Sequence, residues 1–227
     1  MAGKGCVFVL AAVVAGAAAG CGPVIGWFVN AFAPPQKVKA VYQPPKGKKM
    51  LVLVDDIRNP VSYEPVKREL TERLNRQLEE NKVAAQTVPY QSVLDLVTAS
   101  TSFHELSVVD VGQKLGADLV LYVHVDRFSV KDDEASPLWQ GRLEATVRMV
   151  DVQRGLAEKR PRLWPEDRDE GYVVEPVETQ PESHPSENYG EQLAETMAEQ
   201  MADRIAKLFY DHEVRAQEAA RRPPEGL

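Results

Sequence analysis

The chain has 227 residues and a formal net charge of −7, with 27 Lys or Arg residues against 34 Asp or Glu residues. This acidic balance excludes general nucleic-acid binding, because that activity needs clustered Lys and Arg to displace counterions. A hydrophobic fraction of 44% is enough for a buried core. Both cysteines, Cys6 and Cys21, precede the predicted folded region, so no disulfide framework or thiol site is expected in it.

The N-terminus has the layout of a secretory signal peptide. Lys4 supplies a positive charge, residues 7–19 form an apolar run, and small residues lead to Cys21. The motif Ala18-Ala19-Gly20-Cys21 resembles the lipobox of bacterial lipoproteins, although Ala18 departs from the usual Leu. That resemblance implies cleavage between Gly20 and Cys21 and acylation of Cys21 with palmitate-class chains.

The same resemblance implies a place in the bacterial cell envelope. Gly22 follows the cysteine, rather than the Asp that resembles an inner-membrane retention signal, which favours the outer membrane facing the periplasm. Two alternatives remain open: an uncleaved anchor from residue 7 to about 33, which is long enough to span a bilayer, and an ordinary cleaved signal. Gly22-Pro23 interrupts the candidate anchor.

The predicted organisation has four parts. Residues 1–20 are the signal peptide, 21–49 a lipidated N-terminus with a Pro- and Lys-rich linker, 50–212 the folded domain, and 213–227 a disordered tail.

The first half of the domain alternates strands and helices. Residues 50–54 are a continuous apolar run, which predicts a buried strand. Pro65 begins a helix that ends near Asn81, with apolar residues at every fourth position, and residues 83–88 form a short strand. A short helix over residues 90–97 follows, and Ser107 and Asp110 have the spacing of a capping box for the next helix.

The stretch 115–128 is the centre of the predicted fold. Gly116 ends the preceding helix, and residues 119–125 form a strand that is apolar on both faces and therefore interior. Residues 139–149 alternate between polar and apolar side chains, which predicts a strand with one solvent-facing and one buried face. Gln153-Arg154-Gly155 is a predicted hairpin turn. Residues 156–164 are predicted to return as a weaker strand that Pro161 interrupts. Residues 171–177 add an edge strand, and residues 193–209 form a long amphipathic helix.

This order predicts a single α+β domain with a mixed four- to five-stranded sheet and helices mainly on one face. The phrases Leu115-Gly-Ala-Asp-Leu-Val-Leu-Tyr-Val, Val150-Asp-Val-Gln-Arg-Gly155 and Ala202-Asp-Arg-Ile-Ala resemble the TolB amino-terminal domain and the curli-secretion and penicillin-binding-protein-activator lipoproteins. The resemblance covers residues 49–212 and implies an envelope protein. Arg154-Gly155 stands where that group usually has Thr-Gly.

Candidate chemistry is sparse. Asp55 and Asp56 end the first strand and Asp126 ends the central one, so the three carboxylates could meet at one sheet edge and bind Mg²⁺ if the strands are parallel neighbours. The alternative is that Asp ends strands because it favours turns. The histidines (His104, His124, His184 and His212) are scattered without metal-ligand spacing, and no nucleophile or phosphate-loop motif is present. No enzymatic activity and no cofactor are therefore expected.

The predicted function is that of a lipid-anchored envelope protein that binds another envelope protein as a scaffold or assembly factor. One alternative is a ligand- or metal-binding domain that uses the acidic strand ends. A further alternative, which the curli-secretion resemblance implies, is a homo-oligomeric, ring-forming secretion subunit.

Overall fold

The computed structural model describes residues 36–55, 61, 63–131, 133, 135–158, 161–184, 186 and 188–214. The predicted signal peptide, the cleavage site at Gly20 and Cys21, and Asp56 lie outside these residues. The chain divides into two compact units. In the smaller unit, β1 (Gln36–Val38) pairs antiparallel with β9 (His212–Val214), and Lys39 forms an exposed ion pair with Asp211 at 2.7 Å.

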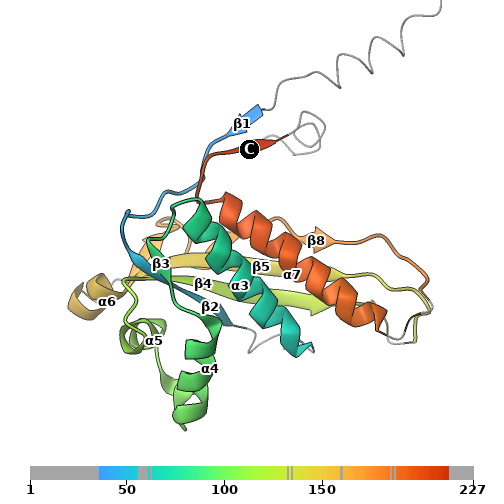
Figure 1. Cartoon of the computed structure of the whole chain (residues 1–227), viewed down its shortest axis with the longest axis horizontal. Coiled ribbons are helices and arrows are strands. Elements are labelled where there is room, and N and C mark those ends of the chain that lie inside the picture. Colours follow the sequence, from blue (N-terminus) through green and yellow to red (C-terminus); the bar gives the residue numbers. More distant parts are fainter. Residues whose placement is uncertain are drawn as a thin grey trace, which may run out of the picture. The chain divides into compact units, whose positions relative to one another are not determined.

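The larger unit, Ala40–Tyr210, is built on a mixed sheet (Figure 1). Its strands follow the order β3-β2-β4-β5-β6, with β2 parallel to both of its neighbours and β5 antiparallel to both of its own. Two short strands pair with further segments of β5. The bounds are β2 (Lys49–Asp55), β3 (Gln86–Thr87), β4 (Leu119–Ser129), β5 (Arg142–Asp151), β6 (Arg162–Trp164), β7 (Tyr172–Val173) and β8 (Val177–Glu178).

Strand β4 lies in the middle of this sheet, which confirms the prediction of an interior strand. It pairs with β2 on one side and β5 on the other, and Leu119, Leu121 and Val123 are fully buried. Val120, on the opposite face, is fully buried as well. Burial on both faces explains why the run is apolar without alternation at its start.

Two long helices, α3 (Glu64–Glu80) and α7 (Tyr189–Lys207), cover one face of the sheet side by side (Figure 1). Each turns an apolar stripe toward the strands, because residues four positions apart share one side of a helix. In α7 this stripe consists largely of Ala and Met, whose small or flexible side chains let the helix pack closely. The fully buried members of the two stripes are Val66, Leu70, Leu74, Leu78, Ala194, Met197, Ala198, Met201, Ala202, Ile205 and Ala206.

Short helices cover only part of the opposite face. They are α4 (Tyr90–Ala99), the 3₁₀ turn η1 (Phe103–Glu105), α5 (Val108–Lys114) and α6 (Val152–Glu158). Their apolar side chains form a second cluster with Leu51, Val120 and Val150. Farther along β4 the same face carries polar side chains, so the arrangement is α+β with the main helical layer on one side.

The connection after β5 corrects one prediction. Residues 153–155 are part of helix α6 and do not form a hairpin turn, so the returning strand β6 begins only at Arg162. Asp151 explains the difference, because its Oδ1 accepts a hydrogen bond from the backbone N–H of Arg154, at 2.8 Å, in the manner of a helix N-cap. The predicted strand over residues 83–88 is likewise shorter, since only Gln86 and Thr87 pair with β2.

The caps of α5 agree with their prediction. Ser107 and Asp110 form a capping box, and Gly116 follows the helix with φ of +63°. Among the described residues, none of the helices has the length and apolar character needed to cross a bilayer.

Candidate functional site

A band of polar side chains crosses the sheet on the face opposite α3 and α7. We call it the polar strip, and its members come from the end of β2, from β4 and from β5. The alternation of strand side chains brings them to one face, and the parallel pairing of β2 with β4 puts Asp55 opposite His124. The polar strip consists of Asp55, Tyr122, His124, Asp126, Thr146 and Arg148.

His124 lies between two of the acidic residues that the sequence singled out. Its Nδ1 is 3.4 Å from Oδ2 of Asp55 and its Nε2 is 3.9 Å from Oδ1 of Asp126. Asp126 occupies a register shift in β4 between Val125 and Arg127, and it accepts a hydrogen bond from the Thr146 hydroxyl at 2.6 Å. A bulge of this kind re-aims the side chain that it carries.

The hypothesis of a metal site at the strand ends required β2 and β4 to be parallel neighbours, and they are. Asp55 and Asp126 are nevertheless separated by the His124 ring, and Asp56 lies outside the described residues. Within the described ranges, no group of three or more His, Cys, Asp and Glu side chains is arranged to hold a metal ion.

Tyr122 connects this acidic end of the polar strip to a basic end. Its hydroxyl donates a hydrogen bond to Oδ2 of Asp55, and its ring stacks on His124 with the centroids 6.4 Å apart. The guanidinium carbon of Arg148 lies 5.0 Å from the centre of the Tyr122 ring, within the range of a cation–π interaction.

Next to Arg148 the molecular surface is hollowed into a pocket of about 800 Å³. Its floor is the sheet face, and its walls come from the start of α5, from α6 and from the segment around β6. Besides Arg148, the arginines Arg154 and Arg162 line it, and we call it the arginine pocket. Its lining comprises Ser107, Val108, Val109, Tyr122, Arg148, Val150, Arg154, Pro161, Arg162 and Glu166.

Acidic partners neutralise part of this positive charge. Arg154 is 3.4 Å from Glu158 in the next turn of α6, and Arg162 is 2.5 Å from Asp169. Arg162 holds the pKa of Asp169 below its usual value through this hydrogen bond and through its charge. Burial, followed by the negative charges of Glu166 and Asp151, raises the pKa of Tyr42 above its usual value.

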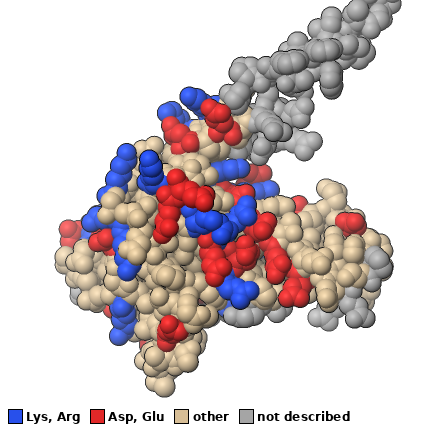
Figure 2. Space-filling model, viewed as in Figure 1, with Lys and Arg blue, Asp and Glu red and all other residues tan. Residues whose placement is uncertain are grey.

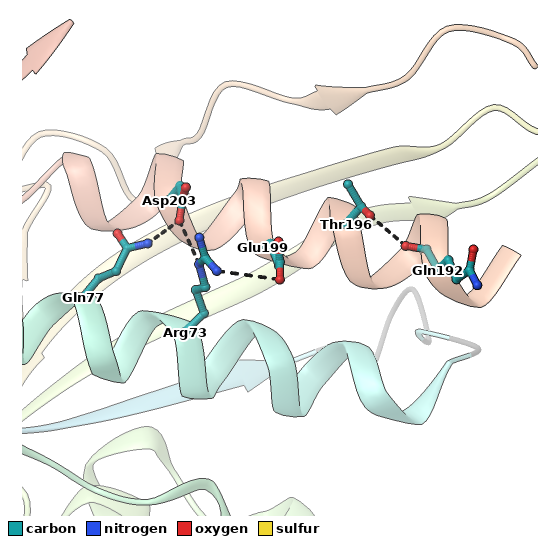
Figure 3. Close-up of polar contacts among 6 residues, drawn as sticks. All are labelled: Arg73, Gln77, Gln192, Thr196, Glu199 and Asp203. Carbon is teal, nitrogen blue, oxygen red and sulfur yellow. Dashed lines mark hydrogen bonds and ion pairs between the residues drawn. The ribbon is translucent and has the colours of Figure 1, made fainter. Parts of the chain in front are cut away.

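The outer surface of α3 and α7 is charged, and ion pairs between the two helices join some of these charges. Figure 2 shows acidic and basic side chains gathered over these helices. Four acids follow one another at every fourth position of α7, and Arg73 of α3 reaches two of them: Glu199 at 3.7 Å and Asp203 at 3.1 Å (Figure 3). The hydrogen bond and charge of Asp203 raise the pKa of Arg73 above its usual value. Gln77 also donates to Asp203, so this contact fastens the two helices together.

Three of the solved structures that match this chain are as follows. A PelC dodecamer from Paraburkholderia phytofirmans is 10% identical, with 78% of this chain and 97% of that chain covered at a TM-score of 0.36. Lipoprotein GNA1162 from Neisseria meningitidis is 16% identical, with 70% and 99% covered at a TM-score of 0.36. Protein XCC0632 from Xanthomonas campestris, of family DUF330, is 12% identical, with 73% and 82% covered at a TM-score of 0.33.

These likenesses are distant. No protein-family profile matches the sequence, and no curated protein sequence is detectably similar to it. Identities of 10–16% and TM-scores of 0.33–0.36 give no basis for transferring a partner or a ring assembly to this chain.

The arginine pocket was missed by sequence reasoning, although each of its arginines is visible in the sequence. The sequence predicted Arg148 on the solvent-facing side of a strand, Arg154 in a hairpin turn and Arg162 in a weak strand. They converge because α6 folds β6 back against β5, where Met149 pairs with Trp164. Asp151 was the available signal, since its capping of α6 is what reverses the chain at this point.

Proposed function

We propose that this protein is a bacterial lipoprotein, acylated at Cys21, whose α+β domain binds another envelope protein as a scaffold or assembly factor. The observation that carries the proposal is the motif Ala18-Ala19-Gly20-Cys21, placed directly after an apolar run that begins behind Lys4. More than one acyl chain on a single cysteine gives stable membrane attachment, whereas one chain binds only marginally.

The position of the compact unit suits a tethered domain. The unit begins at Ala40. Roughly 20 residues separate it from Cys21, and at up to about 3.5 Å per residue they reach no farther than about 70 Å. Tethering within such a distance raises the effective concentration of the domain toward partners on the same membrane. The outer membrane facing the periplasm is the proposed location, because Gly22 and not Asp follows the cysteine.

The scaffold assignment rests on the proposed tether, because a domain held at a membrane is concentrated near partners on that membrane. We further propose that the domain is related to the TolB amino-terminal and penicillin-binding-protein-activator group, on the phrases shared around residues 115–123 and 150–155.

The anchor is tested by substituting its acceptor. Cys21→Ala abolishes acyl labelling and moves the protein out of the membrane fraction, because no thiol is left at the cleavage site. Cys6→Ala is the matched control, since Cys6 lies just before the apolar run and would be removed with the proposed signal peptide. Full retention of the Cys21→Ala protein in membranes would contradict acylation and favour an uncleaved anchor.

The partner is tested by crosslinking in intact cells followed by purification from the membrane fraction. A stoichiometric adduct with a second protein is the expected result, and an adduct of twice the mass of the processed chain would make that partner a second copy. Recovery of only the uncrosslinked chain, with lipid as its sole companion, would overturn the scaffold role while leaving the acylation result intact.

A further inference from the structure

We propose that the arginine pocket binds an amphipathic anion: a ligand with a carboxylate or phosphate group held by Arg148 and an apolar part lying against Val108, Val109 and Val150. This inference goes beyond the proposed scaffold function and does not depend on the anchor at Cys21. It rests on the pocket's size, its lining and the condition of Arg148.

Arg148 has hydrogen-bonding capacity that the protein leaves unused. Its Nε is buried and makes no hydrogen bond within the part of the chain that the structure describes. A buried guanidinium N–H without an acceptor is costly, so in a native protein it calls for an explanation. The Arg148 side chain lines the pocket, so an anion in the pocket would lie beside its guanidinium group and offset the cost of its charge.

The side chain of Arg148 is also held in place before any ligand arrives. The Tyr122 ring lies against its guanidinium group, and Tyr122 is itself fixed by its hydrogen bond to Asp55. On another side the chain passes very close at Gly171, where an added Cβ would lie 3.0 Å from Cγ of Arg148. A positioned arginine loses little side-chain entropy on binding and presents a planar fork suited to carboxylate or phosphate.

Charge around the pocket favours an anion despite the acidity of the whole protein. Three lining side chains are positive and one, Glu166, is negative. Glu158 and Asp169 pair with Arg154 and Arg162 at the surface, whereas the guanidinium of Arg148 faces an aromatic ring. An exposed ion pair is worth little and is readily exchanged, so Arg154 and Arg162 remain able to assist a bound anion.

The rest of the lining indicates what the anion is attached to. Val108, Val109, Val150 and Pro161 are apolar, and they lie beside the arginines on a surface continuous with the second apolar cluster. A volume of about 800 Å³ falls in the range of pockets for small organic ligands, which combine apolar walls with a few polar groups. A bare inorganic ion would leave these apolar walls exposed to water, so the ligand is expected to carry an apolar part.

The test compares two fluorescent probes that share one aromatic body. Anilinonaphthalenesulfonate carries a sulfonate, and N-phenylnaphthylamine lacks it. Both are titrated against the full chain in detergent, with the signal of detergent alone subtracted. The wild-type protein is expected to bind the anionic probe at least about tenfold more tightly than the neutral one, a difference of about 1.4 kcal/mol.

Arg148→Met keeps most of the side chain's volume and removes its charge. We expect about tenfold weaker binding of the anionic probe and unchanged binding of the neutral probe. Arg127→Met, at an exposed position of β4, is the matched control and should change neither. Unchanged anionic binding in Arg148→Met, or an equal loss of both probes in a variant that still melts cooperatively, would overturn the proposal.

A second variant tests the same proposal in case Arg148→Met does not fold. The double substitution Arg154→Met with Arg162→Met removes the other two positive charges of the lining and leaves Arg148 and Tyr122 in place, and it too must weaken the anionic probe selectively. Equal affinity of this double variant and the wild type would count against an anion site.

Displacement of the anionic probe then separates the two sources of such a ligand. Hexanoate and hexyl phosphate represent a free metabolite, and short-chain phosphatidylglycerol below its micellar concentration represents a lipid headgroup. Stronger displacement by the first pair assigns a free ligand, and stronger displacement by the second assigns a lipid. Hexylammonium should displace nothing, and displacement by it as strong as that by the anions would refute the charge requirement.

Discussion

Gly116 shows how a single backbone position ends an element. It follows α5 with φ of +63°, and an added Cβ would meet nothing closer than Nζ of Lys49 at 3.9 Å. The cost of a side chain here is therefore the cost of the left-handed conformation alone. Gly116→Ala is expected to lower the free energy of unfolding by about 1 kcal/mol, and Gly116→Asn by less, because Asn tolerates this region. Urea denaturation measures both, and an equal loss in the two variants would show that space, not backbone conformation, decides the position.

Burial decides the cost of the same chemical change at two leucines. Leu121 is fully buried at the centre of β4, whereas Leu156 on α6 is 44% exposed. Leu121→Ala is expected to destabilise the domain by about 2–5 kcal/mol through lost transfer energy and a cavity. Leu156→Ala is expected to stay within about 0.5 kcal/mol of the wild type. Thermal or urea unfolding of the pair checks this, and similar losses at both sites would mean that α6 packs more tightly than its exposure indicates.

The capping box of α5 makes the stability of an element depend on pH. The Ser107 side chain donates a hydrogen bond to the Asp110 carboxylate, and this bond, followed by one from the Ser107 backbone, lowers the pKa of Asp110 below its usual value. A depressed pKa in the folded state means that the contribution is present above the unfolded pKa of about 3.8 and is lost as pH falls through the folded value. The difference in unfolding free energy between wild type and Asp110→Asn should therefore be constant at neutral pH and shrink below about pH 4.

Measuring that difference by urea denaturation at several pH values tests the prediction. Asp95→Asn, on α4, provides a comparison carboxylate, since Asp95 accepts a hydrogen bond from Gln91 in its own helix. A difference for Asp110→Asn that stays constant down to the lowest pH would contradict the role of its charge.

The contact between α3 and α7 depends on Arg73. A double-mutant cycle of Arg73→Met and Asp203→Asn is expected to give a coupling free energy of about 0.5–1 kcal/mol, because the pair lies at a partly exposed helix surface. Raising the salt concentration to about 1 M should reduce the coupling, since screening then acts over roughly 3 Å. A coupling that salt does not change would point to a packing effect and not to charge.

The elements differ in how far their sequences specified them. The strand over residues 119–125, the helix with Leu70, Leu74 and Leu78 on one side, and the Ser107–Asp110 cap were all predictable, because each depends on a local pattern that its environment reinforces. Helix α6 was not, because Val-Gln-Arg-Gly has turn-like composition, and the segment becomes a helix where Asp151 caps it and α5 packs against it. Its Gly155 is also required by packing, since an added Cβ would lie 2.7 Å from Val109.

At the scale of the whole molecule, the sequence predicts an anchor but did not predict the pocket. Cys21 belongs to a contiguous motif, so its proposed acylation is a prediction that needs no structure. The arginine pocket combines residues from α5, β4, β5, α6 and β6, and their meeting depends on strand order and on one reversal of the chain. The polar strip was predictable in part. The sequence allowed for parallel pairing of the two strand ends, which the structure has, but it gave no sign of the bulge at Asp126.

The pairing of α3 with α7 also constrains when this protein can fold. Arg73 and Asp203 are 130 positions apart in the sequence. The buried leucines of α3 and the buried alanines of α7 belong to the same hydrophobic core. A chain that emerges from a ribosome or an export channel with its N-terminus first exposes the apolar side of α3 until α7 has emerged as well. Folding of the domain must therefore wait until residue 207 is free. During that interval the nascent chain is a substrate for chaperones and proteases, and shortening it before residue 189 should yield aggregated or degraded product in place of a smaller folded domain.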